Sequence, residues 1–170
     1  KNTIQYRVLE KGQRMQIDLQ PPMEITRITQ NEKELSFEKD GNAWFIEMPK
    51  QENGSVQEII VEYSGRPKVA PNAPWDGGLT WSSDNNDNPF IATSCQGEGA
   101  SLWWPCKDHM YDEPDSMLIS LTVPSGLIGV SNGRLRKAED PVKGKQTFHW
   151  FVSNPINNYG VSINIGDYVH

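Results

Sequence analysis

Met117-Leu-Ile-Ser-Leu-Thr-Val-Pro124 carries the clearest strand pattern in this chain of 170 residues. Apolar side chains occupy every second position from Met117 to Val123, and the polar side chains of Ser120 and Thr122 lie between them. Successive side chains of a strand point to opposite faces of the sheet, so this pattern gives one apolar face and one polar face. The stretch therefore predicts a half-buried antiparallel strand.

Shorter stretches with the same alternation lie on both sides of it, separated by glycine, proline and asparagine turn signals. Asp40-Gly41 and Asn53-Gly54 are predicted to close hairpins, and residues 127–131 to pair next to 117–124. No amphipathic helix of more than two turns is visible. The pattern predicts an all-β fold, an antiparallel β-sandwich or pair of twisted sheets with a dozen or more short strands and little helix. The expected strands are residues 4–8, 15–19, 25–28, 35–37, 44–48, 59–63, 79–82, 90–93, 117–123, 127–131, 134–138, 148–152 and 159–165, with Pro124-Ser125-Gly126 as a turn.

Two loops interrupt the strands. Residues 66–78 contain three prolines and two glycines, which exclude regular structure, and we expect Trp75 to hold this loop in place. Residues 84–88, Asp-Asn-Asn-Asp-Asn, read either as a polar hairpin tip or as a calcium loop. The second interpretation lacks the glycine and the glutamate of an EF-hand loop, since Pro89 and Cys95 stand at those positions.

Length and charge limit the kinds of protein and of binding partner that fit this sequence. A chain of this length suits one domain with its own core, and six Trp, five Tyr and five Phe argue against disorder. The net charge of −6 argues against nucleic acid or an anionic membrane surface as the main partner. No apolar run approaches the roughly 20 residues of a membrane span. The compartment stays open, because the Asn53-Gly54-Ser55 sequon is too common to decide it.

The stretch from Cys95 to Pro114 concentrates the unusual residues: both cysteines, two adjacent tryptophans and a histidine. Gly97 and Gly99 permit a tight turn that presents Gln96 and Glu98 on a constrained loop. We expect Trp103 and Trp104 to anchor this loop in the core. Glu98 and Asp108 are expected to accept hydrogen bonds from loop N–H groups.

Catalytic and metal-binding patterns are missing from the sequence. The histidines, at positions 109, 149 and 170, form no His-Glu-x-x-His pattern, and no nucleophile with an adjacent base can be assembled. We therefore expect no catalytic residue, metal ligand or cofactor in this chain, although a metal or catalytic role for His109 stays open. Cys95 and Cys106 allow either a disulfide or two small buried thiols.

An ordered series of motifs resembles the N-terminal domain of the aminopeptidase N family of zinc metallopeptidases. It comprises Cys95-Gln96-x-Glu98-Gly99, Trp103-Trp104-Pro105-Cys106-x-Asp108, Asp112-Glu113-Pro114, Ser116–Pro124, Val130–Gly133, His149–Pro155 and Ile163–Asp167. The resemblance implies a saddle-shaped all-β domain spanning residues 1–170. It implies a piece of a longer protein, without its first strand or strands and without the downstream catalytic domain. Zinc and the general base belong to that catalytic domain, so this chain alone is expected to be inactive.

The resemblance also implies one substrate-binding residue. The family's Gln or Glu at the position of Gln96 reaches the active-site cleft and holds the free α-amine of a peptide substrate; Gly97 and Glu98 are its neighbours. An amide oxygen accepts a hydrogen bond from an ammonium group, so the role is chemically sound. The implied partners are the N-terminus of a peptide and the catalytic domain in cis. Two positions depart from the family pattern. The family often has another Gln at the position of Ser94, and its proline follows the Pro-Cys-x-Asp motif almost at once, whereas Pro114 comes later.

Two other functions remain open on the sequence. A carbohydrate-binding module would expose Trp75, Trp81, Trp103 or Trp104 as coplanar rings. A protein-interaction domain of a catalytically inactive relative would carry the same strands with no peptidase role. The alternative reading of Gln96, as a residue that only closes a turn, also stays open.

Overall fold

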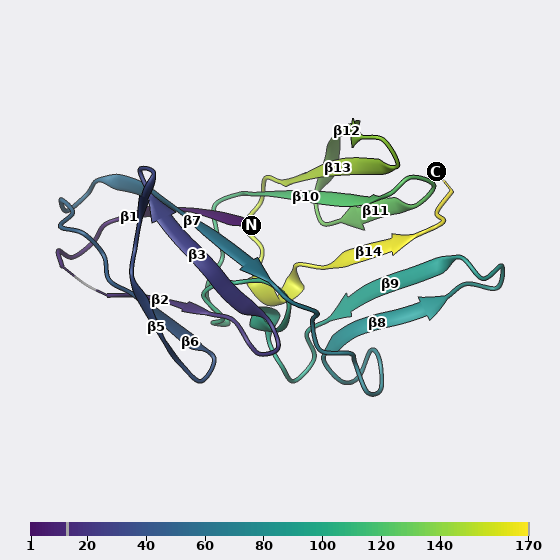
Figure 1. Cartoon of the computed structure of the whole chain (residues 1–170), viewed down its shortest axis with the longest axis horizontal. Helices are drawn as coiled ribbons and strands as arrows, with labels where there is room; N and C mark the ends of the chain where they lie inside the picture. The colour runs from purple at the N-terminus through teal and green to yellow at the C-terminus, as the bar shows by residue number, and fades with distance from the viewer. Residues whose placement is uncertain (13, 170) are drawn as a thin grey trace. The chain divides into compact units, whose positions relative to one another are not determined.

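The structure is a computed structural model of the chain and describes residues 1–12 and 14–169. In these residues fourteen strands form four antiparallel sheets, with two short 3-10 turns, η1 (Ala100–Leu102) and η2 (Asn158–Gly160) (Figure 1). The all-β, antiparallel prediction is therefore confirmed. None of the helical segments in the described ranges is long and apolar enough to cross a bilayer. His170 lies outside the described residues.

The chain divides into two compact units. The first comprises residues 1–68 and 100–108, and the second comprises residues 69–99 and 109–170. The central stretch recognised in the sequence therefore contributes to both: residues 95–99 to the second unit and residues 100–108 to the first.

The first unit contains one sheet with the order β1-β7-β3-β4 and one with the order β2-β6-β5. Its core is made of apolar side chains from both sheets and from the segment between β2 and β3: Ile17, Leu19, Met23, Ile25, Ile28, Trp44, Ile46, Ile59 and Val61. The Trp44 indole N–H donates to the carbonyl of Leu19 at 3.1 Å, which satisfies the polar end of this buried ring. The strands are β1 (Asn2–Arg7), β2 (Met15–Asp18), β3 (Glu24–Gln30), β4 (Lys33–Glu34), β5 (Phe37–Asp40), β6 (Ala43–Ile46) and β7 (Val56–Ser64).

One of the two predicted hairpins in this unit is wrong. Asp40-Gly41 does join the paired strands β5 and β6. Asn53-Gly54 joins β6 to β7, and these strands lie in different sheets. The Gly54 N–H donates to the Val8 carbonyl at 2.8 Å, and the Val8 N–H donates to the Ser55 carbonyl at 2.9 Å. The turn therefore extends the pairing of β1 with β7, which sequence neighbours could not reveal.

The second unit contains one sheet with the order β10-β13-β12 and one with the order β11-β14-β9-β8. The expected strand at residues 127–131 is present as β11, but it pairs with β14 instead of β10. Strand β12 runs on to Val142, four residues beyond the predicted end, because Glu139 and Val142 continue its pairing with β13 around an irregularity between them. The strands are β8 (Gly78–Ser83), β9 (Pro89–Ser94), β10 (Met117–Pro124), β11 (Ile128–Ser131), β12 (Arg134–Val142), β13 (Lys145–Val152) and β14 (Ile163–Gly166).

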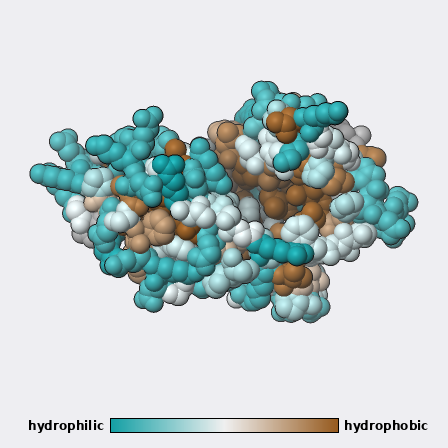
Figure 2. Space-filling view, in the orientation of Figure 1, coloured by the Kyte–Doolittle hydropathy of each residue, from teal (hydrophilic) through white to brown (hydrophobic). Residues whose placement is uncertain are grey.

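The two sheets of this unit approach each other at Gly129. A Cβ atom there would lie 3.0 Å from Cβ of Leu121, so a larger residue would push β11 away from β10. The Trp150 indole N–H donates to the Gly129 carbonyl at 2.8 Å. Apolar side chains farther along β11 and β14, such as Val130 and Ile163, are only half-buried. Apolar atoms are correspondingly visible over this part of the surface (Figure 2).

Candidate functional site

The backbone of residues 95–99 forms the tight turn that the sequence predicted. The carbonyl of Cys95 accepts hydrogen bonds from the N–H groups of Glu98 at 3.1 Å and of Gly99 at 2.9 Å. Gly97 and Gly99 adopt φ angles of +72° and +89°, which side-chain-bearing residues rarely take. Cys95 is buried at the base of the turn, whereas Gln96 and Gly97 at its tip are exposed. The turn therefore projects the Gln96 side chain from a constrained backbone.

Among the hydrogen bonds of the described residues, none joins the Gln96 side chain to the backbone of this turn. Its Oε1 accepts a hydrogen bond of 2.7 Å from the hydroxyl of Tyr159, which is 46% exposed. Both residues belong to the second unit. Sequence reasoning missed Tyr159, because the alternation of residues 159–165 predicted one continuous strand. In the structure β14 begins only at Ile163, and Tyr159 lies in η2.

The turn is supported by the loop that precedes β8. Ser94 donates from Oγ to the carbonyl of Pro74 at 2.7 Å. A Cβ atom at Gly77 would lie 2.6 Å from Cβ of Glu98, so the loop and the turn are in close contact where residue 77 lacks a side chain. The expectation that Trp75 holds this loop in place is wrong, since 73% of its surface is exposed. Small residues and backbone contacts hold the loop there instead.

Asp108 has the structural role predicted for it. Its carboxylate accepts hydrogen bonds from the Ala100 N–H at 3.2 Å, the Ser101 N–H at 3.0 Å and the Ser101 hydroxyl at 2.6 Å. Its own N–H donates to the carboxylate of Asp18 at 3.0 Å. Asp108 therefore fixes η1 within the first unit and is not aimed at a ligand.

The cysteines and tryptophans of the central stretch are part of the framework. Cys95, in the second unit, and Cys106, in the first, are both buried, and no disulfide is present in the described residues. Trp103 and Trp104 are half-buried, their rings are tilted by 43°, and both indole nitrogens are buried. These two rings do not form the coplanar, exposed surface expected of a carbohydrate-binding module, whereas Trp75 and Trp81 are 73% and 46% exposed.

The metal-binding hypotheses gain no geometric support. His109 is exposed, and its Nδ1 accepts the N–H of Tyr111 at 3.2 Å. The Asp84 carboxylate accepts the N–H groups of Asn86 at 2.7 Å and Asn88 at 2.9 Å, and these hydrogen bonds lower its pKa. This is the bonding of a polar hairpin tip. In residues 1–12 and 14–169 no three His, Cys, Asp or Glu side chains are grouped as metal ligands would be.

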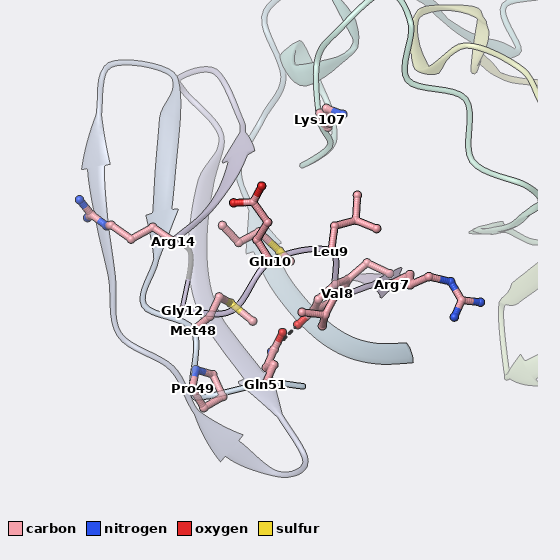
Figure 3. A pocket seen from close by; sticks show the side chains of 12 residues that line it. Arg7, Val8, Leu9, Glu10, Gly12, Arg14, Met48, Pro49, Gln51 and Lys107 are labelled. Atoms are coloured by element: carbon pink, nitrogen blue, oxygen red, sulfur yellow. Dashed lines mark hydrogen bonds between the residues drawn. The ribbon is translucent and has the colours of Figure 1, made fainter. Parts of the chain in front are cut away.

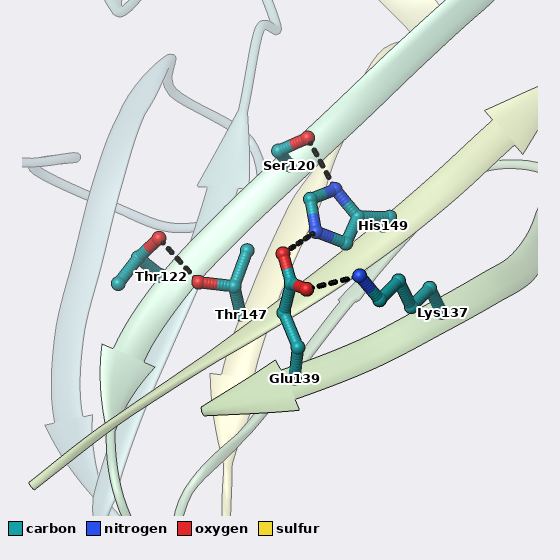
Figure 4. A network of polar contacts seen from close by, with 6 residues as sticks. All are labelled: Ser120, Thr122, Lys137, Glu139, Thr147 and His149. Atoms are coloured by element: carbon teal, nitrogen blue, oxygen red, sulfur yellow. Dashed lines mark hydrogen bonds and ion pairs between the residues drawn. The ribbon is translucent and has the colours of Figure 1, made fainter. Parts of the chain in front are cut away.

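A row of polar side chains crosses the sheet β10-β13-β12 (Figure 4). Ser120 Oγ lies 2.8 Å from His149 Nδ1, and His149 Nε2 lies 3.0 Å from Glu139 Oε1. Lys137, followed by His149, lowers the pKa of Glu139. The order Ser120, His149, Glu139 resembles the nucleophile, base and acid of a hydrolytic triad. These residues lie on the surface of a sheet, however, with Ser120 and Lys137 exposed. A hydrolytic triad needs donors placed around a developing oxyanion, and the described contacts of this row provide none.

A groove of about 500 Å³ lies in the first unit, around the end of β1. Its two arginines already have partners: Arg7 donates to the Gly54 carbonyl, and Arg14 pairs with Glu38 and Glu47. Figure 3 shows the Arg7 and Arg14 side chains pointing away from each other. The two arginines therefore do not converge on a ligand in this groove, and the turn at Gln96 remains the better candidate site.

Comparison with known proteins relates the fold to one group of enzymes. The M1 zinc metallopeptidase from Deinococcus radiodurans matches with a TM-score of 0.76 at 17% identity, over 96% of this chain and 36% of that chain. A mutant of the same enzyme bound to a Tyr-Ser-Ala substrate matches with a TM-score of 0.77 at 18% identity, over the same shares. The matched part is the N-terminal portion of those enzymes. The resemblance seen in the sequence is thus confirmed at the level of the fold.

A curated relative is transcription initiation factor TFIID subunit 2 from Drosophila melanogaster, which is 26% identical over 130 residues. The match covers 72% of this chain but 11% of that protein. No model of a known protein family matches the chain. The chain therefore spans only a part of the proteins it is similar to.

Proposed function

We propose that this chain, which has the fold of the N-terminal region of M1 zinc metallopeptidases, is the non-catalytic N-terminal domain of a zinc aminopeptidase. The zinc and the general base belong to a separate catalytic domain of the same protein. This chain caps the active-site cleft and contributes a binding group for the free α-amine of the peptide substrate.

The observation that carries this proposal is the presentation of Gln96. Its amide is exposed at the tip of a turn, where the residues around it fix the backbone and leave the side chain facing solvent. An ammonium group has three N–H donors, and the amide oxygen retains a second lone pair besides the one that Tyr159 occupies. A residue that only closed the turn would direct its polar atoms into the turn's own hydrogen bonds.

The binding energy fits the proposed role. A hydrogen bond between a neutral group and a charged group contributes about 1.5–3 kcal/mol, which corresponds to roughly a 10-fold to 150-fold change in an equilibrium constant. Such a contact also fixes the peptide bond to be cleaved at a set distance from the amine and raises the rate by positioning. A substrate whose amine is acetylated loses the positive charge and two of the three N–H donors, so it gains much less from this contact.

The test compares full-length protein with its Gln96→Ala variant on an amino-acid 4-nitroanilide with a free α-amine and on its N-acetylated twin. We expect Gln96→Ala to lower kcat/KM for the free amine at least tenfold and to leave the acetylated substrate unchanged, with zinc content intact. Gln5→Ala, which truncates an exposed glutamine on β1, is the matched control. Equal activity of Gln96→Ala and Gln5→Ala on the free amine contradicts the proposal.

A second candidate function rests on the relative that is a subunit of a transcription initiation factor. In that case this chain is a protein-interaction domain within a larger assembly and has no peptidase role. The same experiment separates the two functions. A full-length protein that holds no zinc and hydrolyses neither substrate favours the interaction domain.

A further inference from the structure

The hydrogen bond between Tyr159 and Gln96 joins two exposed side chains whose positions in the sequence are 63 residues apart. Exposed polar pairs of this kind add little to the stability of a fold, because each group exchanges one hydrogen bond with water for another. The pair is instead a feature of the surface at the tip of the Gln96 turn.

Hydrogen bonds to each of the three residues of η2 hold the backbone at Tyr159 in place. The Oδ1 of Asn157 accepts the Tyr159 N–H at 2.8 Å and caps this turn. Asn158 is 2% exposed and donates to the carboxylate of Asp112 at 3.0 Å. Asn132 donates to the carbonyl of the last residue of η2 at 3.0 Å. The backbone that carries Tyr159 is thus as constrained as the turn that carries Gln96.

The direction of the hydrogen bond decides what the pair offers. Tyr159 donates its single hydroxyl hydrogen to Gln96 Oε1, so the phenol oxygen has only lone pairs left for a ligand. Gln96 Oε1 also retains one lone pair. Two acceptor oxygens therefore lie 2.7 Å apart on a constrained surface. A primary ammonium group, with three N–H donors on one nitrogen, is the ligand that suits two adjacent acceptors.

We propose that the Tyr159 hydroxyl is a second acceptor for the α-ammonium group of the substrate, beside Gln96. This inference rests on the proposed function, since it assigns a further specificity-determining residue to the same site. The phenol oxygen binds the ammonium directly and does not act only by orienting the amide. Selection for a free N-terminus is then shared between the two oxygens.

The test uses the full-length protein with Tyr159→Phe, Gln96→Ala and both changes together. Tyr159→Phe removes only the oxygen, so the ring and the fold of η2 are kept. We expect it to lower kcat/KM for the free-amine 4-nitroanilide about tenfold, with no change for the N-acetylated twin. A further loss of at least threefold is expected when Tyr159→Phe is added to Gln96→Ala, because a direct acceptor still acts when the amide is gone. Tyr111→Phe, which removes another exposed hydroxyl, is the control.

Each result separates the two proposals. If Gln96→Ala erodes the free-amine preference and Tyr159→Phe does not, the function stands and the role of Tyr159 is overturned. If Tyr159→Phe has an effect alone but none in the Gln96→Ala background, Tyr159 only positions the amide, and the direct contact is overturned. If neither variant differs from Tyr111→Phe, or if full-length protein hydrolyses neither substrate, both proposals fail.

Discussion

Asp108→Asn is expected to destabilise the first unit far more than its small change in shape suggests. The carboxylate accepts three hydrogen bonds, from the N–H groups of Ala100 and Ser101 and from the Ser101 hydroxyl, and none of them is longer than 3.2 Å. Asparagine keeps the size of the side chain but replaces one acceptor oxygen with an NH₂ donor. Whichever way the amide turns, one of the two backbone N–H groups then faces another donor.

The magnitude follows from the bonds that are lost. A hydrogen bond to a charged acceptor contributes about 1.5–3 kcal/mol, and a buried donor left without a partner adds to the cost. The Ser101 hydroxyl can turn round and accept a hydrogen bond from the new NH₂ group, which offsets part of the loss. We therefore expect Asp108→Asn to lower the free energy of unfolding by about 2–3 kcal/mol.

The assay is urea unfolding followed by tryptophan fluorescence, since Trp103 and Trp104 adjoin η1. Asp115→Asn is the control, because it makes the same change of charge at an exposed position. Amide hydrogen exchange at Ala100 and Ser101 gives the local measurement, and both amides are expected to exchange faster in Asp108→Asn alone. If Asp108→Asn unfolds within about 0.5 kcal/mol of Asp115→Asn and both amides stay protected, the carboxylate does not hold η1.

Two further predictions concern stability. Ile59 lies in β7 and has no exposed surface, so Ile59→Ala should lower the free energy of unfolding by about 2–5 kcal/mol. Val56→Ala, at a 51% exposed site on the same strand, should lower it by less than about 1 kcal/mol. Equal unfolding midpoints of the two variants in urea would contradict this description of the core. Burial, with a smaller contribution from Cys106, raises the pKa of Tyr63 from 10.0 to about 12. The unfolded chain therefore loses this proton first, and the free energy of unfolding should fall between about pH 10 and pH 12, by roughly 2–3 kcal/mol at most. The Tyr63→Phe variant should not show this part of the alkaline loss of stability. If the free energy of unfolding of the two proteins falls in parallel above pH 10, the prediction is refuted.

The sequence by itself determined the class of fold and most of the strands. Alternation at Met117–Val123 is a local property of the chain, and a strand with one apolar face is the local structure that buries that face. The glycines at positions 97 and 99 likewise specified a tight turn, because few other residues adopt the backbone angles found there. The role of Asp108 could also be foreseen, since its partners lie within eight residues.

The pairing of strands was decided only by the tertiary structure. Asn53-Gly54 has a good hairpin sequence, yet it connects two sheets, and β11 pairs with β14 instead of with β10, which precedes it in the sequence. Alternation fixes which side chains face a core but carries no information on which edge a strand joins. That choice depends on close contacts such as the one between Gly129 and Leu121.

The candidate site divides in the same way. Gln96 could be singled out from the sequence, because the motifs around it are contiguous. Tyr159 could not, since its alternation with Val161 and Ile163 is that of a strand, and only the Asn157 cap turns the chain into η2. The hydroxyl that meets the Gln96 amide is thus placed by contacts between residues more than sixty positions apart, and such contacts exist only in the folded chain.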